Sequence, residues 1–154
     1  TNKVFIYLDE FALYLISPDD HIIKKYPIAV GTPYYPTPTG KYFVKEKIYY
    51  PVWYPPDSPW AKGAKPIPPG WGNPLGTRWI GLDKNIVGIH GTPSSWSIGR
   101  AASHGCIRMY IHQVEELFEL VDIGTPVNIY ASRPEGHEKY RVKKKSLSKD
   151  TAGG

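Results

Sequence analysis

One cysteine and two nearby histidines are the residues of this chain best suited to catalysis. Cys106 is the only cysteine in the 154 residues, so it has no partner for a disulfide within the chain. His104 lies two residues before it and His90 sixteen residues before it. The thiolate is the nucleophilic form of cysteine, and a nearby imidazole generates it by accepting the thiol proton. This spacing predicts a Cys/His site for acyl transfer.

The neighbours of Cys106 suggest how the other tasks of such a site are divided. His90 ends a strand-like run and is the better candidate for the base. His104 could also approach the sulfur if the chain between them is extended, or could only brace the loop. Gly105 leaves its own N–H and that of Cys106 open to a substrate carbonyl, as oxyanion donors. Arg108 could bind a substrate carboxylate or pair with a helix glutamate.

Two other uses of these residues compete with acyl transfer. Free cysteines are often buried and inert, although the small and polar neighbours of Cys106 favour a reactive thiol. Zinc is the second alternative, with His90, His104, Cys106 and His112 as its potential ligands. The chain lacks the Cys-x-x-Cys and His-Glu-x-x-His spacings, so no metal or other cofactor is expected. We expect His112 near the start of a helix, in a structural role.

The charge of the chain is concentrated at its C-terminal end. Residues 1–132 hold 12 Lys/Arg and 11 Asp/Glu, whereas residues 133–154 hold 7 and 3. A nearly neutral body argues against nucleic-acid binding. We expect residues 133–154 to form a basic, solvated, flexible tail, with contact to an anionic polymer as the alternative. His21, in a turn, and His137, in the tail, are expected in solvent.

Hydrophobic patterning predicts a mainly β domain with one helix. Short strand-like runs cover residues 4–8, 12–16, 22–30, 41–49, 79–82, 86–90 and 125–130. The first four suggest an antiparallel meander, and residues 92–103 read as a loop or short helix. Val114, Leu117, Phe118 and Val121 recur at helical spacing, which predicts a helix over about 112–122, closed by Gly124. No apolar run is long enough to predict a transmembrane segment.

Residues 49–79 form an unusual Pro-rich, aromatic segment. It holds 8 of the 16 prolines, which exclude a regular helix or a central strand. Its aromatic residues are Tyr49, Tyr50, Trp53, Tyr54, Trp60, Trp71 and Trp79. The segment could form a wall or lid of a substrate cleft, or it could be a packed connector that caps the core.

Several stretches of this sequence resemble the YkuD-type L,D-transpeptidases. That family has a histidine followed, about a dozen residues later, by Ser/Thr-x-Gly-Cys. The matching runs here are His90-Gly91-Thr92 and Ser103-His104-Gly105-Cys106-Ile107-Arg108-Met109. Similar stretches also occur at Pro36-Thr37-Pro38-Thr39-Gly40, Gly72-Asn73-Pro74-Leu75-Gly76-Thr77 and Gly124-Thr125-Pro126-Val127. The resemblance covers residues 3–131 and implies a β-sandwich of mixed sheets, with the helix packed beside the cysteine loop.

The resemblance also implies a catalytic domain over residues 1–132 with defined roles. Cys106 would attack a peptidoglycan stem tetrapeptide and expel its terminal D-alanine, with His90 as the base and the Gly91 carbonyl orienting it. Substrate and oxyanion contacts would come from Ser103, His104, Gly105 and Arg108. An amine of a neighbouring stem would then accept the acyl group, which gives a 3→3 cross-link. A carbapenem would acylate the same thiol.

The acceptor and the setting remain open at the sequence level. Water as the acceptor would make the protein an L,D-carboxypeptidase, and the 49–79 aromatics alone would suit a non-catalytic wall-binding module. The chain opens on Thr1-Asn2-Lys3 without a visible signal peptide, as expected of a mature secreted protein or a trimmed chain, with a cytosolic protein as the alternative. Action on peptidoglycan would place it outside the cytoplasm, in the wall or periplasm or secreted.

Overall fold

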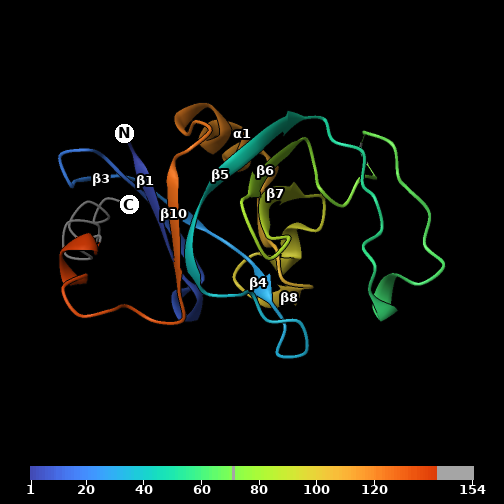
Figure 1. The fold of residues 1–154 in the computed structure, drawn as a ribbon, viewed down its shortest axis with the longest axis horizontal. Helices are drawn as coiled ribbons and strands as arrows, with labels where there is room; N and C mark the ends of the chain where they lie inside the picture. Colours follow the sequence, from blue (N-terminus) through green and yellow to red (C-terminus); the bar gives the residue numbers. More distant parts are fainter. Residues whose placement is uncertain (71, 142–154) are drawn as a thin grey trace, which may run out of the picture.

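Figure 1 shows the computed structural model of the chain, which describes residues 1–70 and 72–141. The strands and the helix follow in the order β1 (Lys3–Tyr7), β2 (Ala12–Ile16), β3 (Ile22–Pro27), β4 (Val30–Gly31), β5 (Gly40–Tyr49), β6 (Arg78–Leu82), β7 (Gly88–Thr92), β8 (Ala101–Ser103), β9 (Ile107–Tyr110), α1 (Ile111–Leu120) and β10 (Pro126–Tyr130). Short 3-10 turns lie at Leu8–Glu10, Pro59–Ala61, Ser95–Ser97 and Glu138–Tyr140. The predicted mainly β fold with one helix is confirmed.

A mixed sheet of eight strands, in the order β3-β2-β1-β10-β5-β6-β7-β9, forms the body of the domain. Strands β1 to β3 form the predicted antiparallel meander. The prediction is wrong for β5, because β10 lies between β1 and β5 and pairs in parallel with β1. The central position of β10 is consistent with its apolar side chains, because Val127 and Ile129 are fully buried there.

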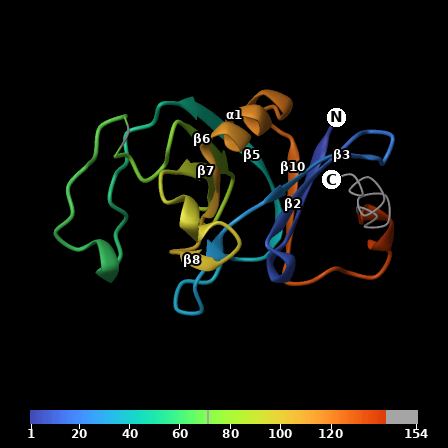
Figure 2. The ribbon, with the colours of Figure 1, turned by 180° about the vertical axis from the view of Figure 1, so that it is seen from behind.

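The long strand β5 joins two halves of the sheet around one core. Its first residues pair with β10, and its later residues pair with β6 across a break in register between Val44 and Glu46. Aliphatic residues of both halves and of α1 meet in a single buried cluster. Figures 1 and 2 show β1, β2 and β10 on one side and β6 and β7 on the other, with β5 passing between them. The core thus fixes β6 and β7, on which the candidate site lies.

Helix α1 packs against β7, with further contacts to β6 and β9. It buries Val114, Leu117 and Phe118, as the pattern predicts, but it spans 111–120 rather than about 112–122. Val121 is already extended, and Gly124 (φ 93°) lies in the following turn, so the prediction that it closes the helix is wrong. Val121 stays buried in the core, which is why its spacing still resembled that of the helix.

The first part of the predicted tail is anchored to the sheet. The Arg133 guanidinium, only 4% exposed, binds Glu10 at 2.7 Å and donates to the carbonyls of His137 and Tyr140. Tyr140 is buried and donates its hydroxyl proton to Asp20. The chain is therefore packed through Tyr140, beyond the expected domain end at residue 132.

His137 belongs to this packed segment. Its Nδ1 lies 2.8 Å from the Tyr7 hydroxyl, and its ring packs 4.8 Å from that of Phe5. The solvated position predicted for His137 is therefore wrong, whereas His21 is exposed as predicted. Residues 142–154, which carry most of the basic tail, lie outside the described residues, and their contact with an anionic polymer stays a prediction.

Candidate active site

Two paired strands, β7 and β9, place the central residues of the predicted site. Strand β7 pairs in parallel with β9, so that His90 lies beside Arg108. Side chains alternate along a strand, so His90 faces one side of the sheet while Gly91 faces α1 on the other. A Cβ atom on Gly91 would approach Val114 of the helix to 3.1 Å. Cys106 directly precedes β9, which brings the thiol to the face that His90 occupies.

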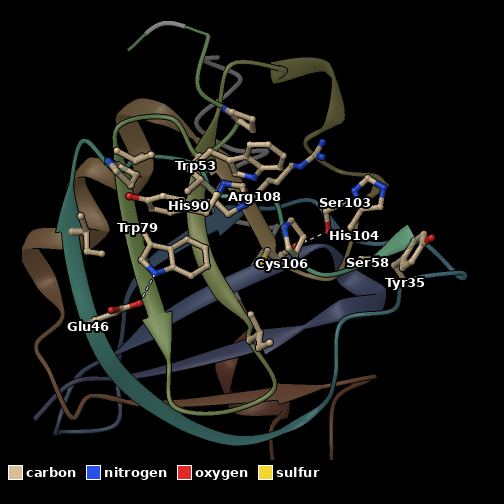
Figure 3. Close-up of a pocket in the computed structure, with 18 of the residues that line it drawn as sticks. Tyr35, Glu46, Trp53, Ser58, Trp79, His90, Ser103, His104, Cys106 and Arg108 are labelled. Atoms are coloured by element: carbon tan, nitrogen blue, oxygen red, sulfur yellow. Dashed lines mark hydrogen bonds between the residues drawn. The ribbon is translucent and has the colours of Figure 1, made fainter. Parts of the chain in front are cut away.

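A cleft of about 940 Å³ opens over these strands. His90, Ser103, His104, Cys106 and Arg108 all line it, and Figure 3 shows their side chains gathered together. Much of the remaining lining is aromatic or proline: Tyr35, Tyr50, Pro51, Trp53, Tyr54, Pro56, Trp60, Pro74 and Trp79. Its size suits a substrate larger than a single amino acid.

The His90 ring is buried and held in one orientation. It is 5% exposed, and its Nδ1 lies 2.6 Å from the Gly91 carbonyl oxygen. A carbonyl only accepts hydrogen bonds, so Nδ1 carries the proton and Nε2 keeps its lone pair. Burial, together with the nearby positive charge of Arg108, lowers the pKa of His90 to about 4, against the smaller effect of the Gly91 hydrogen bond. At neutral pH His90 is thus a neutral base.

The Cys106 thiol is also uncharged at neutral pH. Burial raises its pKa, while a main-chain hydrogen bond with Gly88 and the charge of Arg108 act in the opposite direction. Cys106 is half-buried and free of any disulfide. The resting pair is therefore a thiol and a neutral imidazole rather than an ion pair.

Ser103 shapes the turn that carries the thiol. Its buried hydroxyl donates to the Cys106 carbonyl at 2.6 Å and accepts from the Gly105 N–H at 3.1 Å. Gly105 has a φ of 123°, which an L side chain rarely adopts. Its N–H is occupied within the turn, which differs from its predicted role as an oxyanion donor. Within the described part of the chain no hydrogen bond occupies the Cys106 N–H.

The geometry of His104 does not favour the role of a base. The turn at Gly105 breaks the extended geometry that would have aligned His104 with the thiol. Its exposed ring instead stacks on Trp60, with centroids 3.7 Å apart and planes at 10°, and meets the edge of Tyr35 at 5.0 Å. Of the two roles left open by the sequence, the structure favours bracing.

Arg108 is the cationic group of the cleft. No carboxylate among residues 1–70 and 72–141 lies within ion-pair distance of it. Two helix glutamates instead serve other partners: Glu115 accepts from Thr77, and Glu116 accepts from Tyr26. The alternative of an Arg108 pair with the helix is therefore not formed, and the guanidinium is available to a substrate carboxylate.

The aromatic segment is both an ordered connector and a wall of the cleft. Trp53 and Ile67 exchange two main-chain hydrogen bonds, and the buried Asn73 amide donates to the carbonyls of Pro51 and Ile67. Trp71 lies outside the described residues. The two interpretations that the sequence left open thus apply together. The role of Asn73 had only one sequence signal, an asparagine placed before a proline at the end of a loop.

Residues 1–70 and 72–141 contain no group of three or more His, Cys, Asp or Glu side chains arranged to hold a metal ion. His112 is on the first turn of α1, as expected, and stacks on Tyr110. The same residues include no helix with the length and apolarity needed to cross a membrane.

The fold and cleft define a mainly β domain that holds a thiol and a neutral imidazole in one substrate-sized site. Comparison with known proteins gives the family: residues 1–129 match YkuD, described as the L,D-transpeptidase catalytic domain. The chain belongs to this family of L,D-transpeptidases, which are enzymes of the acyltransferase kind.

Relatives and solved structures agree with this family. A Bacillus subtilis protein assigned as the L,D-transpeptidase YkuD is 37% identical over 114 residues, which cover 74% of this chain and 57% of that protein. The chain thus spans little more than half of that relative. An L,D-transpeptidase from Mycobacterium smegmatis shares the fold, with a TM-score of 0.71 at 21% identity over 84% of this chain and 58% of that one. The L,D-transpeptidase LdtMt1, solved in complex with imipenem, gives a TM-score of 0.68 at 19% identity over the same shares.

Proposed function

We propose that this chain is a peptidoglycan L,D-transpeptidase that acts outside the cytoplasm, with Cys106 as nucleophile and His90 as base. One observation carries the assignment of roles. The Gly91 carbonyl fixes the proton of His90 on Nδ1, so the free Nε2 belongs to an imidazole that shares its cleft with the only thiol of the chain. A general base must be neutral before it can accept a proton, and the lowered pKa of His90 and the hydrogen bond at its Nδ1 support this role.

The donor step follows from these groups. Cys106 Sγ attacks the carbonyl carbon of the third residue of a stem tetrapeptide, and its proton passes to His90 Nε2. The Cys106 N–H stabilises the negative charge that develops on the carbonyl oxygen. The C–N bond to the terminal D-alanine then breaks, and the same proton passes to the leaving amine. The product is a thioester on Cys106 and a neutral His90.

The acceptor step reverses the roles. An amine of a second stem attacks the thioester carbonyl and loses a proton to His90, and the new amide forms as Cys106 is released. The departing sulfur recovers the proton from His90, which completes the cycle with a 3→3 cross-link. Arg108 would hold a carboxylate of the donor, such as that on a diaminopimelate side chain, through paired hydrogen bonds.

Mass spectrometry of the products tests this function. The protein is incubated with a disaccharide-tetrapeptide, beside a Cys106→Ala variant. The expected product is a dimer that lacks one D-alanine, formed only by the wild type. Trimmed monomer alone would assign water as the acceptor and make the protein an L,D-carboxypeptidase. Unchanged substrate across a range of stem peptides would refute both activities and leave a wall-binding role for the aromatic segment.

Imipenem gives a second readout of the nucleophile. The thiol should open its β-lactam ring and add the whole molecule to the protein as one covalent adduct. Intact-mass measurement should find this adduct on the wild type and not on Cys106→Ala. An adduct of equal yield on both proteins would place the nucleophile elsewhere.

A further inference from the structure

The indole of Trp79 lies flat on two glycines of the sheet. Trp79 is the second residue of β6, Gly81 lies two residues further on the same face, and Gly88 is paired with Gly81 on β7. A Cβ atom on Gly88 would lie 2.2 Å from Trp79 Cη2, and one on Gly81 would lie 2.8 Å from Trp79 Nε1. Any larger residue at either position would displace the ring. The two glycines therefore form a floor for this indole.

The ring is also fixed at its edge and in its contact with the base. Trp79 Nε1 donates to a Glu46 carboxylate oxygen at 3.0 Å, as the dashed line in Figure 3 marks. Trp79 is the register partner of His90, and the two rings stack with centroids 5.9 Å apart and planes at 24°. The indole thus covers the flank of the imidazole that faces β6.

Few charged or titratable groups lie close enough to His90 to influence its pKa. Cys106 and Arg108 face it from the β9 side, and His104 lies in the same cleft. Glu46 lies on β5, beyond the indole. Helix α1 is on the opposite face of β7. Burial is the largest influence on the pKa of His90, so a group that covers one face of the ring helps to keep it uncharged.

We propose that Trp79 is a positioning residue for His90: held by Glu46 and the floor of Gly81 and Gly88, it keeps the imidazole dry, neutral and correctly turned toward the thiol. The inference rests on the proposed role of His90 as base. The chemical consequence of this role concerns the lowest pH at which His90 can still act as a base. With the indole in place, the base stays neutral in mildly acidic solution, because the indole keeps water from one face of the ring and so weakens the solvation of a proton on it.

The first measurement is an NMR titration of the histidine side chains, with His90→Gln used to assign the His90 signal. In the wild type the pKa of His90 should be about 4. In Trp79→Ala it should rise by about one unit or more toward the ordinary value of about 6.5, and in Glu46→Ala by less. Glu46→Gln keeps an acceptor for the indole N–H and should behave as the wild type. Trp96→Ala is the matched control, because Trp96 is 68% exposed and does not line the cleft.

The second measurement is the rate of acylation of Cys106 by imipenem between pH 4.5 and 8. If the pKa of His90 reaches about 6 in Trp79→Ala, its acylation at pH 5, relative to its own rate at pH 8, should fall about tenfold further than in the wild type. Trp79→Phe keeps a ring over His90 and should lie between the two. It also supplies the comparison should Trp79→Ala fail to fold.

The outcomes separate the two proposals. An unchanged His90 pKa in folded Trp79→Ala, or in Trp79→Phe and Glu46→Ala if the first variant does not fold, would overturn the role of Trp79. A wild type that imipenem does not acylate would refute the proposed function, while the NMR titration would still report on Trp79, since it needs no turnover.

Discussion

At the level of single residues, the candidate site holds the His90 imidazole and the Cys106 thiol in their uncharged forms at neutral pH. Burial acts on both partners in the direction of the uncharged form, because it lowers the pKa of His90 and raises that of Cys106. Proton transfer therefore has to accompany attack on the substrate instead of preceding it. Such a thiol stays unreactive toward weak electrophiles until a carbonyl is held in place beside it.

This state predicts a distinct response of the thiol to pH. Thiolate absorbance at 240 nm should be absent at pH 7 and should appear only above the ordinary thiol range of about 8.5, because the folded protein raises the pKa of Cys106. Alkylation by iodoacetamide should follow the same curve. Cys106→Ala supplies the baseline. A plateau of thiolate from pH 5 upward would show an ion pair and contradict the neutral state.

Sequence points to the proposed nucleophile and base more readily than to the groups packed around them. Residue type and spacing single out Cys106 and His90, and the family motif singles out the Gly91 carbonyl; their catalytic roles stay a proposal. Trp79 and Glu46 could not, because 33 residues separate them and only the β5–β6 pairing brings them together. The hydrogen bond from the Gly105 N–H to the Ser103 hydroxyl could not be predicted either, since it depends on a turn geometry that residue types do not specify.

At the level of elements, the cleft joins a rigid sheet to an irregular wall. Strand β7 carries His90, Cys106 directly precedes β9, and β6 carries Trp79. Residues 50–77 supply most of the other aromatic side chains of the cleft. The stack of Trp60 on His104 is a direct link between the two, because His104 belongs to the cysteine loop. Loosening the wall should thus affect substrate binding more than the chemistry of the thiol.

Removal of that stack tests the link. Trp60→Ala should raise the KM for the disaccharide-tetrapeptide about two- to tenfold, since an aromatic pair contributes about 0.5–1.5 kcal/mol, while kcat changes little. Hydrogen exchange of residues 50–70 should become faster in the variant. Trp96→Ala serves again as the control. A fall in kcat with no change in KM would mean that Trp60 acts on the cysteine loop itself.

The long elements were predictable and the short ones were not. Strands β1 and β2 are nearly continuous apolar runs, the first half of β5 alternates, and helix α1 follows a helical pattern. Strands β4, β8 and β9 have only two to four residues, too few for a period to show. The Pro-rich composition of residues 49–79 correctly excluded an α-helix or a central strand over residues 50–70 and 72–77, although Tyr49 ends β5 and Arg78 begins β6. Sequence could not separate a wall from a connector, because the same rings serve both.

At the level of the whole molecule, the end distant from the cleft is closed by the C-terminal segment. The buried Arg133 guanidinium joins Glu10 to the carbonyls of His137 and Tyr140, and it stacks 4.2 Å from the ring of Tyr7. One side chain thus connects the first turn of the chain with its last described turn. This cluster contributes to stability without contacting the site.

Arg133→Ala should separate stability from activity. Loss of the cation leaves the partly exposed Glu10 carboxylate without its main partner and two carbonyls unsatisfied, at a cost of about 2 kcal/mol, which lowers Tm by about 6 °C. Acylation by imipenem at 25 °C should be unchanged. The exposed Arg100→Ala is the control for removal of a positive charge. A Tm within about 2 °C of the wild type would mean that the segment adds little to the fold.

The way in which residues 50–77 are anchored affects how much of this segment could be replaced without disturbing the sheet. The wall departs from the end of β5 and returns at the start of β6, two paired strands, and it is braced by Asn73, by the Trp53–Ile67 bridge and by one aromatic stack. An exchange of this insert for another of different length leaves the sheet beneath it intact. A change in this insert can therefore alter the lining of the cleft while Cys106 and His90, which lie outside residues 50–77, are left in place.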